Sequence, residues 1–132
     1  MAGTNSDYTE NKLVDEICGT TAFVMPVVKL ALFTVNPNFE TGAGGTEATG
    51  GGYVRKAVSF SASSGGATSN SAAVAWTVGT DIAAATYTGW AVYDADAAGN
   101  MLFGDAFSSN KVLTGSGDIL NFAIGVLTYS LT

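Results

Sequence analysis

The chain has 132 residues, of which 47% are apolar and 12% are charged, and its formal net charge is −6. This length suits one domain with a buried core. Five basic residues, of which only Arg55 and Lys56 are adjacent, are too few to follow a phosphate backbone, so we expect no nucleic-acid partner. The sequence has neither a basic and apolar leader nor a run of about 18 apolar residues. We therefore expect no secretory signal and no membrane partner.

The first 20 residues are predicted to form an arm and a short helix. Asp7 and Glu10 have the spacing of a capping box, which predicts a helix over 8–18 that ends at Gly19. About eleven residues make a marginal helix in water, so its apolar stripe must dock on its own β domain or on a neighbouring subunit. The lone cysteine is predicted to be a small buried side chain. The stripe consists of Leu13, Val14, Ile17 and Cys18.

Residues 21–132 are predicted to form a β domain. Short apolar runs alternate with turn signals about every ten residues, which is typical of an antiparallel β-sandwich, jelly-roll-like or immunoglobulin-like. We expect an all-β, jelly-roll-like fold of about eight strands. The expected strands are 27–35, 53–60, 73–78, 90–93, 101–103, 111–113, 119–122 and 125–131, with 107–110 as a turn before the sixth.

The stretch 87–103 is predicted to be the central hairpin. Its two apolar runs flank a polar turn from Asp94 to Asn100, in which Gly99 or Asn100 supplies a positive φ. A strand that is apolar on both faces belongs in the middle of a packed pair of sheets. The faces of the first strand are predicted to be Trp90 and Val92 on one side and Tyr87, Ala91 and Tyr93 on the other.

A glycine-rich stretch occupies 41–52. A phosphate-binding loop requires a Lys after the glycines and a helix behind it, whereas this stretch leads into a predicted strand. We interpret it as a flexible connector or as a loop that becomes ordered on contact with a partner. Gly44, Gly45 and Glu47 are its candidate contact residues.

The side chains that most enzymes need are scarce in this sequence. It has no His and one Cys, which excludes His-dependent triads and cysteine-ligated clusters. Asp94 and Asp96 loosely resemble a calcium loop, but a hairpin turn explains them without the missing ligands. Trp76, Trp90 and Tyr93 could stack on a sugar, although core packing is the more economical explanation. We expect no enzyme activity, no catalytic residue, no cofactor and no metal; a two-carboxylate glycosidase stays open.

Several segments resemble a family of small tailed-bacteriophage virion proteins, labelled tail-fibre or capsid-decoration proteins. The resemblance implies an antiparallel β domain, symmetric oligomerisation and no catalysis, and it supplies no catalytic residue. The similar segments are 6–23, 30–37 (LALFTVNP), 45–60 (GTEATGGGYVRKAVSF), 89–107 (GWAVYDADAAGNMLFGDAF) and 117–131.

These observations lead to one hypothesis and one alternative. The hypothesis is a capsid decoration (cement) protein, made in the host cytoplasm, that binds the outer head surface as a trimer. Its partners would be the major capsid protein and copies of itself, and many weak contacts would add up through avidity. The alternative is a tail-fibre or tail-tip adhesion module that recognises a host surface glycan. The candidate partner-contact residues are Tyr8, Leu13, Val14, Ile17, Gly44, Gly45 and Glu47.

Overall fold

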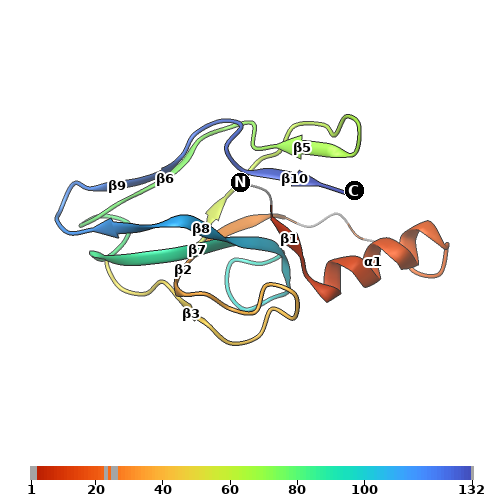
Figure 1. Cartoon of the computed structure of the whole chain (residues 1–132), viewed down its shortest axis with the longest axis horizontal. Coiled ribbons are helices and arrows are strands. Elements are labelled where there is room, and N and C mark those ends of the chain that lie inside the picture. The colour runs from red at the N-terminus through yellow and green to blue at the C-terminus, as the bar shows by residue number, and fades with distance from the viewer. Residues whose placement is uncertain (1–2, 23, 25–26, 132) are drawn as a thin grey trace.

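The computed structural model describes residues 3–22, 24 and 27–131, which form an antiparallel β-sandwich with one short helix (Figure 1). This confirms the predicted all-β class. One layer is a six-stranded sheet in the order β1–β8–β7–β2–β3, with β4 also paired to β2. Two two-stranded sheets, β6–β9 and β5–β10, form the other layer. The elements are β1 Thr4–Asn5, α1 Asp7–Ile17, β2 Lys29–Val35, β3 Thr46–Glu47, β4 Lys56–Ala57, β5 Ala67–Ser69, β6 Val74–Thr77, β7 Ala85–Tyr93, β8 Met101–Leu113, β9 Ile119–Phe122 and β10 Thr128–Ser130.

The hairpin of β7 and β8 is central, as predicted. β7 pairs with β2 on one edge and with β8 on the other. Its turn closes through the Asn100 amide, which donates to the Asp94 carboxylate at 2.7 Å, and Gly99 has the expected positive φ of 73°. Apolar side chains cover both faces of the hairpin. The inner cluster includes Leu30, Leu32, Trp76, Trp90, Val92 and Phe122, and the outer cluster is Ala31, Phe33, Ala91, Tyr93 and Met101.

A register shift between β7 and β8 overturns one strand prediction. Tyr87 pairs with Lys111, whereas Gly89 pairs with Ala106, so more residues of β8 than of β7 lie across this point. Such an insertion is a β-bulge, which bends a strand without ending it. Residues 107–113, predicted to be a turn followed by a new strand, therefore continue β8.

The same shift changes the face on which Tyr87 lies. Strict alternation places Tyr87 with Ala91, but its side chain is 1% exposed and packs in the inner cluster with Trp90. Its hydroxyl donates to the Ala83 carbonyl at 2.6 Å. Period-2 alternation holds only within an unbroken register, so the prediction is wrong on the far side of the bulge.

The predicted strand 53–60 is reduced to β4. The Tyr53 hydroxyl accepts a hydrogen bond from the Leu32 amide at 3.1 Å, so a side chain satisfies this donor of β2 where a neighbouring strand would otherwise do so. Strands β3 and β5 occur inside stretches predicted to be loop and turn.

The predicted boundary at residue 20 remains a prediction, although β1 pairs with β8 and so belongs to the large sheet. The jelly-roll-like connectivity also remains a prediction. No helix in the described ranges is long and apolar enough to cross a membrane.

Close packing at Gly104 of β8 allows a test of this sheet. A Cβ atom there would lie 2.6 Å from the Trp90 carbonyl oxygen and 2.7 Å from the Ala91 Cβ. We expect Gly104→Ala to lower the free energy of unfolding by about 2 kcal/mol, because overpacking forces the strands apart. Urea unfolding measures the change. The control is Gly115→Ala, where a Cβ has no neighbour within 4 Å. Unchanged stability in Gly104→Ala would contradict this packing.

Candidate interaction surfaces

Buried hydrogen bonds attach the start of α1 to β8. The Ser6 side chain is buried, and its Oγ donates toward the carbonyls of Met101 and Leu102. The Thr9 hydroxyl donates to the Leu102 carbonyl at 2.7 Å, and the Ser6 amide donates to the same carbonyl at 3.1 Å. We call this set the Ser6–Thr9 latch. It sets where the helix leaves the sandwich.

The N-cap of α1 is Ser6, so the predicted Asp7 capping box is wrong. Ser6 Oγ accepts from the Thr9 amide at 3.3 Å, which is the N-cap bond. Asp7 instead lies in the first turn, and its amide donates to the Glu40 carbonyl at 2.7 Å. Both residues suit a cap in isolation, and burial against β8 selects the serine.

The helix ends at Ile17 with Cys18 as its C-cap, and Gly19 is the C′ residue, as predicted, with a φ of 70°. Its amide donates to the Glu16 carbonyl at 3.2 Å, and the Thr20 amide donates to the Asp15 carbonyl at 2.9 Å. This pair of bonds is a Schellman motif.

Most of the apolar stripe of α1 is left uncovered by its own domain. The exposed fractions of Val14 and Ile17 are 59% and 81%, and Cys18 is also exposed, so its predicted burial is wrong. Leu13 is half-buried, and Tyr8 packs on the inner cluster. The helix therefore contacts the sandwich through its first turns and presents Val14 and Ile17 to solvent. The helix itself projects from one end of the molecule (Figure 1).

The glycine-rich stretch divides into an exposed turn and an anchored end. Gly44 and Gly45 are exposed. A Cβ on Gly45 would lie 2.6 Å from the Pro37 nitrogen, so the chain folds tightly back here. Glu47 is half-buried and bound within its own chain, as described next.

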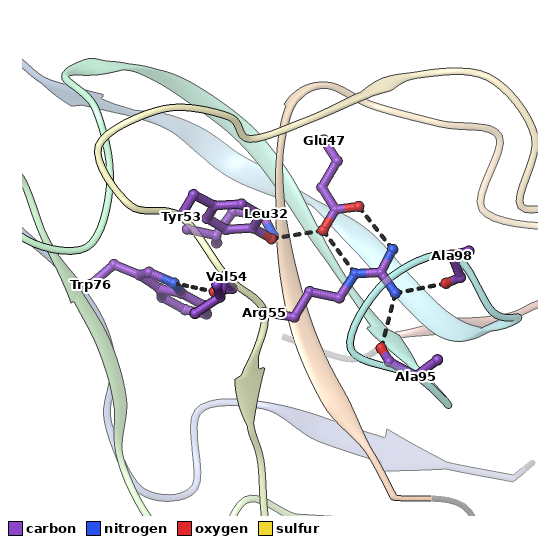
Figure 2. Close-up of polar contacts among 8 residues, drawn as sticks. All are labelled: Leu32, Glu47, Tyr53, Val54, Arg55, Trp76, Ala95 and Ala98. Carbon is purple, nitrogen blue, oxygen red and sulfur yellow. Dashed lines mark hydrogen bonds and ion pairs between the residues drawn. The ribbon is translucent and has the colours of Figure 1, made fainter.

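Arg55 joins three segments that are distant in sequence (Figure 2). Its Nε and Nη2 donate to the two carboxylate oxygens of Glu47, each at 2.8 Å. Its Nη1 donates to the carbonyls of Ala95 and Ala98 at 3.0 and 2.8 Å. The guanidinium also lies 3.8 Å from the centre of the Tyr93 ring. Arg55 thus ties β3 and the hairpin turn to the segment before β4.

The electrostatics of this cluster are those of a structural ion pair. Burial opposes the charge on Arg55, but the hydrogen bonds and charge of Glu47 outweigh it, so the pKa of Arg55 is raised. Burial, with the nearby Glu47 carboxylate, raises the pKa of Tyr53 far above its ordinary value. Four of the five guanidinium N–H groups have acceptors. The Glu47 carboxylate therefore forms an ion pair within its own chain. The sequence alone indicates Glu47 as a candidate contact residue.

The aromatic side chains considered for sugar stacking are buried. Trp76 and Trp90 are both 0% exposed and Tyr93 is 8% exposed, so they are core residues and form no open platform. Among residues 3–22, 24 and 27–131, no group of acidic or Cys side chains could hold a metal ion. Asp94 binds Asn100 in the hairpin turn instead.

A groove of about 440 Å³ lies between the C-terminal half of β8 and β9. Val112 and Ile119 are on its walls, with exposed fractions of 62% and 59%. Sequence reasoning missed this groove, because its walls come from strands whose mutual position depends on the whole fold. The sequence did contain one signal: Val112 and Ile119 are apolar, and no predicted core contact accounted for either of them. The lining residues are Phe107, Asn110, Lys111, Val112, Leu113, Ile119, Leu120, Asn121, Phe122 and Val126.

Comparison with known proteins identifies the class. A family model described as "Podophage GP4 fiber I protein gp80" matches residues 4–130. The chain is a structural protein of the bacteriophage particle, which confirms the resemblance seen in the sequence. It belongs to the podophage GP4 fiber I protein gp80 family. A search of curated proteins finds no match.

The Ser6–Thr9 latch leads to a stability prediction. We expect Ser6→Ala to lower the free energy of unfolding by about 1–2 kcal/mol, because it removes both the cap and a buried hydroxyl donor. The control is Ser109→Ala at an exposed position of β8. Equal unfolding midpoints in urea for the two variants would contradict the latch.

The Arg55–Glu47 pair leads to a second stability prediction. We expect Glu47→Gln to cost about 2 kcal/mol, because the guanidinium stays buried without its counter-charge. The control is Asp96→Asn, which breaks the ion pair of Lys29 with a carboxylate whose side chain is 81% exposed and should cost under about 0.5 kcal/mol. Chemical unfolding of both variants measures the difference, and equal losses would contradict a structural role for Glu47.

Proposed function

We propose that this chain is a subunit of a fibre on the outside of a podophage particle. The observation that carries the proposal is the family description, which names a fibre protein and covers residues 4–130. It favours the fibre over the decoration role that the sequence first suggested. In this proposal the chain works by shape and adhesion, as a homo-oligomer for which a trimer is the expected state.

The exposed apolar side chains support a role in assembly. Complete burial of one large aliphatic side chain contributes about 1.5–3 kcal/mol, so a partner that covers Val14 and Ile17 gains substantial free energy. Repetition of such contacts in an oligomer adds avidity.

The buried tryptophans weigh against glycan recognition as the task of this domain. Sugar-binding faces use accessible aromatic rings. Trp76 and Trp90 are enclosed in the core, and Tyr93 lies under Arg55. We therefore propose a scaffolding part in the fibre rather than the glycan-binding tip.

Capsid decoration is the second candidate, with the major capsid protein as partner. The described residues form a single sandwich with no elongated shaft, which suits a module that lies on a shell. In that case α1 and the exposed turn at Gly44 and Gly45 would contact the capsid.

Copy number and position in the particle separate the two candidates. We expect quantitative mass spectrometry of purified virions to give far fewer copies of this chain than of the major capsid protein. Antibody labelling in electron micrographs should then mark discrete fibres. Copy numbers close to that of the major capsid protein, with label over the whole head, would overturn the fibre proposal in favour of decoration. Absence of the chain from particles would overturn both.

A further inference from the structure

We propose that α1 of one copy docks into the β8–β9 groove of a second copy, in a head-to-tail contact. The inference rests on the homo-oligomer of the proposed function and adds how its copies join; it does not depend on where they sit in the virion. It rests on two surfaces of the same chain that match in polarity and charge and lie far apart in the monomer.

The groove is open because its two walls are strand edges. β8 pairs with β7 on one edge, and on the other edge β1 pairs only with Phe103 and Gly104. β9 pairs with β6 on one edge. Within the described residues, no third strand bridges the C-terminal half of β8 and β9. Val112 and Ile119 are left exposed where such an element would lie.

The solvent face of α1 is a suitable occupant. Glu10, Val14 and Ile17 follow the i, i+4, i+7 spacing and so share one face of the helix. All three are exposed. A helix with its side chains is about 10 Å wide, and it offers apolar groups in its middle and at its C-terminal end, with a carboxylate one turn earlier.

The charges of the two surfaces are opposite. Lys111 is the one charged residue that lines the groove. It lies 5.7 Å from the Phe107 ring, and none of the three ion pairs in the described ranges involves it. The helix is acidic, with Asp7, Glu10, Asp15 and Glu16 against Lys12. Because the whole chain carries −6, copies repel one another on average, and a local basic site directs the approach of an acidic helix.

The positions of the surfaces set the symmetry of the contact. α1 lies at one end of the long axis of the molecule, and β9 with the C-terminal end of β8 lies at the other (Figure 1). The helix therefore cannot reach the groove of its own chain. A contact between two different patches is heterologous, so it repeats until a ring closes or a filament grows. The expected trimer would be a ring of three such contacts.

Two double variants, each of which blocks one side of the contact, test it on the isolated protein. Val14→Asp with Ile17→Asp blocks the helix and leaves the groove, whereas Val112→Asp with Ile119→Asp blocks the groove and leaves the helix. All four side chains are exposed, and circular dichroism checks that both variants fold. We expect the wild type to be oligomeric in light scattering coupled to size exclusion, and each variant alone to be monomeric. A mixture of the two variants should form a 1:1 heterodimer and nothing larger. The intact helix of one variant can enter the intact groove of the other, and no second contact is possible.

Several results would overturn the proposal. These are a monomeric wild type, variants that associate as the wild type does, and a mixture that stays monomeric. Ile124→Asp is the control, because Ile124 is 68% exposed but does not line the groove. This substitution should leave the oligomer intact.

A charge swap tests the orientation of the helix. We expect Glu10→Lys or Lys111→Glu to weaken self-association roughly fivefold, as for a single ion pair at an interface, and the double variant to recover most of the loss. Analytical ultracentrifugation measures the dissociation constants. A double variant as weak as the single ones would overturn the pairing of Glu10 with Lys111.

Discussion

The fold depends on the burial of both faces of β7. Trp90 points into the inner cluster and Tyr93 into the outer one, so apolar side chains are buried on both faces of this one strand. On the outer side the Tyr93 ring supports Arg55, which holds β3 and the hairpin turn in place. A single buried strand thus positions the core and, through one guanidinium, the surface loops.

Local patterns in the sequence were sufficient for the central hairpin, its turn and the helix end at Gly19, because each depends on neighbouring residues. Local patterns failed where contacts with residues distant in the sequence determine the structure. The side of the strand on which Tyr87 lies depends on a register shift with β8. The choice of Ser6 as the cap depends on its burial against β8. The β8–β9 groove exists only after both strands are placed, so periodicity could not indicate it.

The sequence indicated the candidate contact residues only in part, for the same reason. The sequence identified the apolar stripe of α1, but composition does not say which side of a helix faces its own domain. The structure separates Tyr8, which packs on the core, from Val14 and Ile17, which face solvent. Glu47, also a candidate contact residue, is the counter-ion of Arg55, which the sequence did not indicate.

The attachment of α1 has a mechanical consequence. Its first turn is bonded to Met101 and Leu102, at the start of the longest strand, and β1 runs antiparallel beside the next residues. A pulling force on the helix would therefore enter the sandwich along β8 and spread to β7 across their shared ladder. A particle that meets shear in its surroundings would then strain its most extensively paired strand first.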